Sequence, residues 1–189
     1  MKLYDGGRAP NPRRVRIFLA EKGVSVPLVP VDMGNLEHRG ETITRLNPLQ
    51  RLPVLELDDG TVIAESVAIG RGALSTACVE MWQRRVEFGL FMAVAAAFRH
   101  LHPAMKTWEV PQIPEWGEAN KVKALEFLAF LDRELAGRPF IAGDHFTIAD
   151  ITGLVAVQFM KPAHIELPQD LDHVRRWYDE VAARPSASA

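Results

Sequence analysis

The chain has 189 residues, 48% of them hydrophobic and 24% charged, which is typical of a globular protein with one ordinary domain or two small ones. The net charge of −2 and the scattered histidines give no basic face, and this argues against a nucleic-acid partner. Cys78 is the only cysteine, which excludes an internal disulfide framework, a four-cysteine zinc site and a paired-cysteine redox motif.

The N-terminal residues MKLYDGGRAP contain no apolar segment of the kind found in secretion signals. The longest apolar stretch, near Leu90–Phe98, is far shorter than the roughly 20 residues that a membrane-spanning helix needs. We therefore expect a protein of the reducing cytoplasm that binds no metal and contacts no membrane.

Short apolar runs alternate with helix-like stretches in about the first third of the chain. A strand is predicted at Lys2–Tyr4. Asn11 and Pro12 predict the start of a helix, because Asn is favoured at the N-cap and Pro at the first helical position. Gly23 predicts its end. The two prolines of the next strand, Val26–Val31, predict a position at the edge of a sheet.

The remainder of this region predicts a short helix over Glu41–Leu46 and then a hairpin. The hairpin strands are Val54–Leu57 and Thr61–Ala64, and an Asp-Asp-Gly turn joins them. The order β-α-β-α-β-β describes a compact α/β domain over residues 1–72.

From Thr76 onward no strand pattern occurs, and apolar residues recur at helical spacing. The apolar face of the first predicted helix consists of Val79, Trp82, Val86, Leu90 and Ala93. That of the second consists of Val122, Leu125, Leu128, Leu131 and Leu135, and this helix ends at Gly137. Two more helices are predicted at Thr147–Phe159 and Leu171–Ala183. The second domain, residues 76–189, is therefore all-α, and the boundary is expected at Arg71–Ala77.

Four stretches resemble the glutathione transferase family over essentially the whole chain. They are Ala9–Gly23, Asn47–Ser66, Arg138–Ile151 and Arg175–Ser186. Each is weakly specific alone, but their order and spacing make coincidence improbable. The resemblance implies a thioredoxin-like N-terminal domain that binds glutathione, a helical domain that supplies the second-substrate pocket, and a homodimer formed through both domains.

The resemblance places the glutathione site around two short motifs. It implies that Leu52-Pro53 is a cis peptide bond and that the backbone of Leu52 binds the cysteinyl part of glutathione. Most X-Pro bonds are trans, but the surrounding LPVLELDDG favours cis here. Glu65 and Ser66 are implied to bind the ammonium and carboxylate of the γ-glutamyl end, a role that is compatible with Ser66 also capping a helix.

The glycine carboxylate of glutathione is implied to meet polar residues of two loops. These are His38, Arg39, Gln50 and Arg51, each of which alone would be interpreted as a solvated surface residue. Arg51 is the best candidate because it adjoins the Leu52-Pro53 motif.

The group that contacts the glutathione sulfur departs from the family pattern. Relatives use a Tyr, Ser or Cys near the end of the first strand, but Ala9 occupies the position that often carries Ser or Thr. Asn11 is the candidate catalytic residue because its amide can donate a hydrogen bond, and helix capping is the alternative role. Tyr4 is better suited to packing.

An apolar pocket for the second substrate is expected in the helical domain. Aromatic residues there are helix core by default, but the irregular segment Pro103–Pro114 favours a pocket rim. The candidates are Phe98, Met105, Trp108 and Trp116. By contrast, Thr147-Ile-Ala-Asp150 is interpreted as a capping box, with Phe146 and Ile151 as its hydrophobic staple, and not as a catalytic motif.

Relatives continue after the position of Ile69 through a complete helix and a loop. Here the next helical pattern begins near Val79, so most of that helix has no counterpart. Either the protein has a genuine deletion or the sequence is joined across unseen residues. The second is favoured because a bare sheet face would expose an apolar patch.

The resemblance implies attack of a glutathione thiolate on a small apolar electrophile, a detoxification chemistry with glutathione as co-substrate and no metal. Two alternatives stay open. One is a glutathione-binding protein with little or no transferase activity, which Ala9 favours. The other is a related glutathione-dependent enzyme, such as a peroxidase or an isomerase. A thioredoxin-type or glutaredoxin-type oxidoreductase is disfavoured because no cysteine lies near the first helix.

Overall fold

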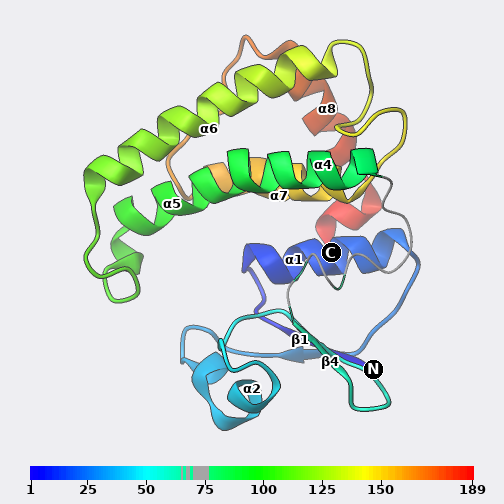
Figure 1. Cartoon of the computed structure of the whole chain (residues 1–189), viewed down its shortest axis with the longest axis vertical. Coiled ribbons are helices and arrows are strands. Elements are labelled where there is room, and N and C mark those ends of the chain that lie inside the picture. Colours follow the sequence, from blue (N-terminus) through cyan, green and yellow to red (C-terminus); the bar gives the residue numbers. More distant parts are fainter. Residues whose placement is uncertain (65, 67–68, 70–76) are drawn as a thin grey trace. The chain divides into compact units, whose positions relative to one another are not determined.

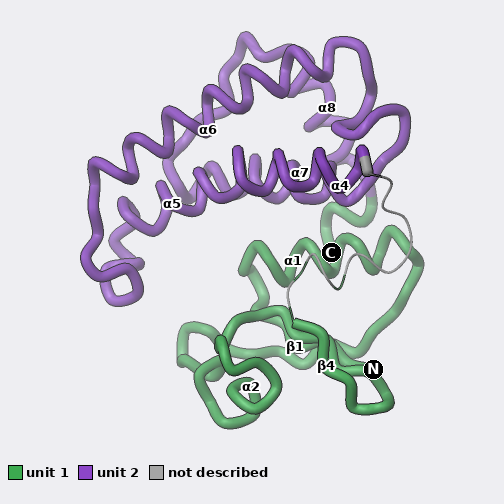
Figure 2. The backbone as a smooth tube through the Cα atoms, in the orientation of Figure 1, with its two compact units in different colours: residues 1–74, 185–189 green, residues 75–184 purple. Residues whose placement is uncertain are grey.

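The structure is a computed structural model that describes residues 1–64, 66, 69 and 77–189. The chain forms two compact units, residues 1–74 with 185–189 and residues 75–184 (Figure 2). The sequence had placed residues 185–189 with the helical domain, whereas their contacts group them with the first unit. The predicted boundary, Arg71–Ala77, lies outside the described residues except for Ala77, where α4 begins.

A four-stranded mixed sheet forms the base of the first unit (Figure 1). Its strands are β1 (Lys2–Asp5), β2 (Leu28–Pro30), β3 (Val54–Glu56) and β4 (Val62–Ala64). They lie in the order β2-β1-β3-β4, with β1 parallel to β2 and antiparallel to β3. The predicted edge strand and hairpin are confirmed. The edge strand is shorter than predicted, and its flanking Pro27 has no N–H to extend the pairing.

The sheet has an apolar cluster on each face, as the alternation of strand side chains requires. Leu3 and Leu55 pack with Val15 of the first helix, whereas the neighbouring Tyr4 and Val54 pack in the other cluster. That second cluster includes Ile43 of α2 (Glu41–Leu46), the short helix that the sequence predicted. The first helix therefore lies over one face of the sheet, and α2 lies over the other.

Tyr4 is a packing residue, as expected. Its side chain is buried, and its hydroxyl donates to Glu56 Oε2 at 2.9 Å. This hydrogen bond lowers the pKa of Glu56 below its ordinary value. The Tyr4 hydroxyl is thus already engaged with a strand neighbour.

The first helix, α1 (Pro10–Glu21), begins earlier than predicted. Its N-cap is Ala9, which provides no side-chain hydrogen bond, and Pro10 is the first helical residue. A second proline, Pro12, is also tolerated because N–H groups of the first turn have no intrahelical acceptor. Asn11 therefore lies inside the first turn, and the expectation that it caps the helix is wrong.

The C-terminal residues pack along α1 within the first unit. They form the 3₁₀ turn η4 (Pro185–Ser188). Arg13 Nη2 donates to the carbonyl oxygen of Ala187 at 2.8 Å, and the Ser186 hydroxyl donates to the Glu21 carboxylate. The turn is thereby attached near both ends of α1.

The described residues of the second unit form helices joined by loops and contain no strand (Figure 1). A long helical run consists of α4 (Ala77–Val86), the π-helical turn η2 (Glu87–Phe91) and α5 (Met92–Leu101). It is followed by η3 (Pro103–Met105), α6 (Pro114–Leu135), α7 (Ile148–Met160) and α8 (Asp172–Ala182). The helix predicted around Val122–Leu135 thus begins earlier, at Pro114.

The capping box at the start of α7 is confirmed, and its Asp150 also binds residues outside the helix start. Asp150 is fully buried, and its Oδ2 accepts hydrogen bonds from the N–H and the hydroxyl of Thr147. Its Oδ1 accepts from Ile141 N at 2.8 Å and from Trp177 Nε1 at 2.9 Å. One carboxylate therefore joins the start of α7, the preceding loop and α8.

Two glycines allow α6 to pack closely against the preceding helical run. A Cβ on Gly89 would overlap the ring of Phe127, and one on Gly117 would overlap the side chain of Leu101. Side chains larger than hydrogen are therefore excluded at both positions without movement of the neighbouring helix.

We predict that Gly89→Ala destabilises the protein by about 1–3 kcal/mol, because overpacking against Phe127 outweighs the gain in helix propensity. Gly137→Ala is the matched control, since a Cβ there meets no atom within 4 Å. Urea unfolding monitored by circular dichroism measures both variants. Equal stability of the two variants would contradict this account of the α6 packing.

Candidate glutathione site

The loop between β1 and α1 is fixed by a carboxylate. Asp5 accepts a hydrogen bond from Gly7 N at 3.0 Å and forms an ion pair with Arg16. Arg16 also donates to the carbonyl oxygen of Gly7 at 3.0 Å. Gly7 has a φ of 59°, a conformation that glycine adopts at little cost. This loop therefore gives the first turn of α1 a defined position.

Gly6 brings this loop against the segment that precedes β3. A Cβ on Gly6 would lie 2.8 Å from Met33 Sδ, 3.2 Å from Leu52 Cδ1 and 3.5 Å from Ala9 Cβ. Ala9, the N-cap of α1, and Leu52, 43 positions apart in the sequence, are consequently neighbours. The structure thus brings together two of the regions that the sequence assigned to glutathione.

The Leu52-Pro53 peptide bond is cis, as the resemblance implied. Asn47 shapes the preceding loop, since its Nδ2 donates to the carbonyl oxygen of Arg51 at 2.9 Å and its Oδ1 accepts from Leu49 N at 3.1 Å. Gln50 has a φ of 55° within this loop. Asn47 is a site-shaping residue that the sequence analysis did not single out.

The backbone of Leu52 is the open part of this segment. Its side chain is buried in the cluster of Ile43 and Val54. Among the described residues, no backbone group forms a hydrogen bond with the N–H or the C=O of Leu52. A free donor and acceptor next to a paired strand can bind an extended peptide by strand addition.

Ser66 follows β4 and has only 9% of its surface exposed. Its own backbone is helical, and it is the described residue of the pair to which the resemblance assigns the γ-glutamyl group. Glu65, its predicted partner in binding the γ-glutamyl group, lies outside the described residues.

His38 is buried, which corrects the expectation of a solvated surface residue. It lies in the 3₁₀ turn η1 (Glu37–Arg39), and burial together with the charge of Arg39 lowers its pKa below the ordinary 6.5. A neutral imidazole at pH 7 can donate a hydrogen bond to a carboxylate but brings no positive charge. Arg39 and Arg51 are both exposed and remain the cationic candidates.

Gln50 is held by α2 and is less available than Arg51. Its Nε2 donates to the Thr44 hydroxyl at 3.0 Å, and its N–H donates to the carbonyl oxygen of Asn47. The side chain of Gln50 thus supports the loop conformation.

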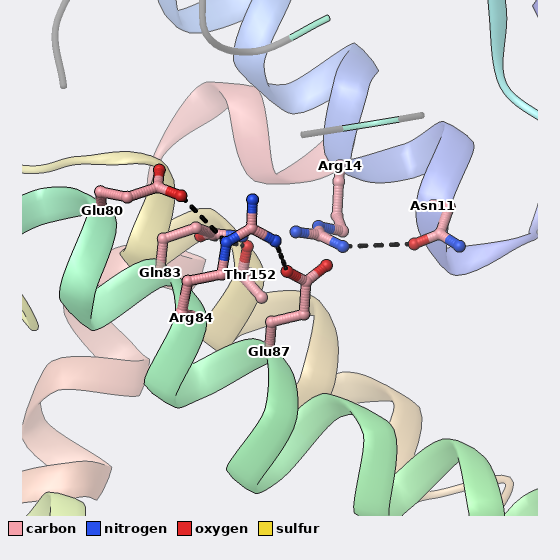
Figure 3. Close-up of polar contacts among 7 residues, drawn as sticks. All are labelled: Asn11, Arg14, Glu80, Gln83, Arg84, Glu87 and Thr152. Carbon is pink, nitrogen blue, oxygen red and sulfur yellow. Dashed lines mark hydrogen bonds and ion pairs between the residues drawn. The ribbon is translucent and has the colours of Figure 1, made fainter. Parts of the chain in front are cut away.

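Asn11 lies exposed in the first turn of α1, and its Oδ1 accepts a hydrogen bond from Arg14 Nη1 at 3.3 Å (Figure 3). Ala9 offers no side-chain donor. Asn11 is thus the residue with a side-chain amide in the first turn of α1.

The residues expected to form a second-substrate pocket have two different surroundings. Phe98 packs against Phe159 and His102, with ring centroids 5.0 and 4.7 Å apart. Trp116 lines a groove of about 610 Å³ between α5 and α6, and Lys123 Nζ lies 4.3 Å from its ring centroid. Phe98 and Trp116 therefore lie on opposite sides of α5.

Met105 and Trp108 belong to the turn that follows α5. Trp108 N donates to the carbonyl oxygen of Met105 at 2.9 Å. The segment is tied to the end of α5 by Gln112, whose Nε2 donates to the carbonyl oxygens of Arg99 and His102. It also contains a second cis peptide bond, Val110-Pro111, which the sequence analysis did not foresee.

In a comparison with known proteins, each of the two units matches a domain of the same family. Residues 9–72 match the family model "Glutathione S-transferase, N-terminal domain", and residues 114–180 match "Glutathione S-transferase, C-terminal domain". The first match lies in the unit with the mixed sheet and the second in the helical unit. The chain belongs to the glutathione S-transferase family, whose members are transferase enzymes.

Individual relatives match along nearly the whole chain. Glutathione S-transferase 2 of Saccharomyces cerevisiae is 35% identical, with 98% of this chain and 87% of that protein aligned. The crystal structure of Gtt2 from the same yeast has a TM-score of 0.92 and covers 100% of this chain and 99% of its own. A glutathione S-transferase domain-containing protein of Marinobacter aquaeolei VT8 is 43% identical, with a TM-score of 0.89 and coverage of 98% and 99%.

The alignment with the yeast enzyme also bears on the short segment after Ile69. It extends over 203 positions, although this chain has 189 residues, so at least 14 of those positions have no counterpart here. The predicted place of the shortfall lies outside the described residues.

Two further findings concern the described residues. They contain no group of three or more His, Cys, Asp or Glu side chains that could hold a metal ion. None of their helices is both long and apolar enough to span a membrane.

We predict that His38 makes the fold sensitive to acid. Because burial lowers its pKa, the folded state resists protonation, and the free energy of unfolding should fall as the pH drops below about 6.5. His38→Gln should weaken this dependence in urea unfolding measured between about pH 7 and pH 5. His145→Gln, at an exposed histidine, is the control. Parallel pH profiles for wild type and His38→Gln would refute the prediction.

Proposed function

We propose that this protein conjugates glutathione with a small apolar electrophile. The open peptide group of Leu52, next to the start of α1, is the observation that carries the proposal. Glutathione is itself a peptide, and its cysteinyl N–H and C=O can pair with Leu52 as an added strand. Its sulfur then lies toward the first turn of α1.

The two ends of glutathione are assigned to polar residues on either side of Leu52. Ser66 binds the γ-glutamyl carboxylate, and Glu65 binds its ammonium group. Arg51 meets the glycine carboxylate as a cation, and His38 meets it as a neutral hydrogen-bond donor. The peptide is thus held at three points, with Pro53 fixing the direction of the backbone beside Leu52.

Asn11 is proposed as the catalytic residue that donates a hydrogen bond to the glutathione thiolate. A thiol with a pKa of about 8.5 is roughly 3% ionised at pH 7, and lowering the pKa by two raises this to about 75%. The less basic thiolate is about eightfold less nucleophilic, so the net gain is only about threefold. Positioning of the two substrates must supply most of the acceleration.

The electrophile is proposed to bind near Phe98, Met105 and Trp108, at the end of α5 and in the turn that follows it. Trp116 was a fourth candidate, but its groove lies on the other side of α5. A pocket at the end of α5 would use the aromatic cluster of Phe98 and Phe159 as its apolar wall.

A glutathione-binding protein with little transferase activity is the second candidate function. The specific observation that favours it is Ala9, which leaves the usual thiol contact without a hydroxyl. Binding of glutathione without turnover of any electrophile in a broad panel would select this alternative. A related glutathione-dependent peroxidase or isomerase would be selected by the corresponding substrates.

Ser66 provides the test of the binding site. We predict that Ser66→Ala weakens glutathione binding about tenfold or more, because a hydrogen bond to a charged carboxylate is lost. Isothermal titration calorimetry measures the affinity, and Ser25→Ala, at an exposed loop position, is the matched control. An affinity equal to that of wild type would remove Ser66 from the site.

We also propose a cytoplasmic location, because a protein with a single cysteine needs no oxidising compartment.

We further propose that the protein is a homodimer. The groove between α5 and α6 is rimmed by large apolar side chains, including Phe88 with 65% and Trp116 with 48% of the surface exposed. Apolar residues gathered in this way are typical of a protein interface.

Light scattering should therefore give about twice the chain mass of 21.1 kDa. Phe88→Asp should shift the protein toward the monomer, because it places a charge in the proposed interface. Val122→Asp is the control, since Val122 is exposed on α6 but does not line the groove. A wild-type monomer at micromolar concentration would contradict the proposal.

A further inference from the structure

Three arginines on α1 hold different parts of the first unit. Arg13 donates to Ala187 in the C-terminal turn, and Arg16 pairs with Asp5 in the loop before the helix. Arg14 donates to Asn11, which lies three residues earlier on the same face of the helix (Figure 3). Arg14 is therefore the arginine that contacts the residue proposed to lie at the glutathione sulfur.

Arg14 is unusual for a charged residue because only 4% of its surface is exposed. A buried guanidinium keeps its charge and has a rigid, planar set of donors. The position of the Arg14 guanidinium relative to Asn11 is therefore fixed, whereas a solvated side chain would adopt several positions.

The chemistry of the contact decides which way the Asn11 amide faces. The two ends of an asparagine amide have nearly the same shape, and its orientation follows from its hydrogen-bond partners. Arginine has donors and no acceptor, so the atom of Asn11 that faces Arg14 must be the carbonyl oxygen Oδ1. The Nδ2 donor then points away from Arg14.

The opposite orientation would be harmful to the proposed chemistry. It would present the carbonyl oxygen of Asn11 to a thiolate, and two electron-rich atoms repel each other. The Arg14 hydrogen bond also withdraws electron density from Oδ1, which makes the N–H groups of the same amide better donors. Ala9 supplies no competing side-chain donor at this end of the helix.

We propose that Arg14 is a positioning residue that holds the Asn11 amide with its Nδ2 directed at the glutathione thiolate. This inference rests on the proposed function, since it assumes that glutathione binds with its sulfur near Asn11. In this proposal Arg14 does not contact glutathione itself.

The test is a double-mutant cycle of Asn11 and Arg14, in which the measured quantity is the pKa of the thiol of bound glutathione. Purified protein is saturated with glutathione, and the ultraviolet absorbance of the thiolate is titrated with pH. Asn11→Ala should raise the thiol pKa by about one, which reduces the thiolate at pH 7 severalfold. Arg14→Met should raise it by a similar amount, and the double variant should add little to either change.

Arg13→Met is the matched control, because Arg13 is the neighbouring arginine and its partner is Ala187. It should leave the thiol pKa unchanged. If Arg14→Met does not fold, Arg14→Lys takes its place, since lysine keeps the charge and lacks the planar donor set. Asn11→Asp provides a further arm, because a carboxylate can pair with Arg14 but cannot donate to the thiolate.

Each outcome separates the inference from the function on which it rests. A raised thiol pKa in Asn11→Ala but not in the Arg14 variant overturns the positioning role and leaves the proposed function standing. Independent, additive changes at the two positions overturn it as well. An unchanged thiol pKa in Asn11→Ala removes Asn11, and with it Arg14, from the thiol site. Failure of the wild-type protein to bind glutathione refutes the proposed function itself.

Discussion

The close approach of the β1–α1 loop to Leu52 is the constraint on which the candidate site depends. Gly6 makes it possible, because a side chain at that position would displace Met33 or Leu52. Pairing of β1 with β3 brings the two segments to the same part of the sheet. Asn47 on one side and Asp5 on the other then hold the two loops in shape. The open peptide group of Leu52 is a result of these contacts together.

Much of the fold could be predicted because its signals are local. The Asp-Asp-Gly hairpin turn, the edge strand with two prolines and the capping box at Thr147 each follow from the conformational preferences of a few adjacent residues. Where a local signal occurred twice, it misled. Pro10 and Pro12 both suit the first turn of a helix, and no local preference distinguishes Pro10 from Pro12 as the first helical residue.

Features that depend on tertiary contacts could not be predicted in the same way. The burial of His38 depends on residues packed around the η1 turn, and nothing in its sequence neighbourhood indicates it. The roles of Gly6 and Gly89 depend on side chains far away in the sequence. The contact of Arg14 with Asn11 is an intermediate case. A spacing of three residues puts both side chains on one face of a helix, but the burial of Arg14 depends on residues packed around it.

The return of the C-terminal residues to α1 has a consequence for how the protein is assembled. The first unit is not a continuous stretch of sequence, since residues 185–189 complete it after the whole helical unit has been traversed. During synthesis, residues 185–189 are therefore made only after all of residues 75–184. A fragment ending at residue 74 would lack the turn attached along α1, so the two units cannot be separated as intact modules by a single cut.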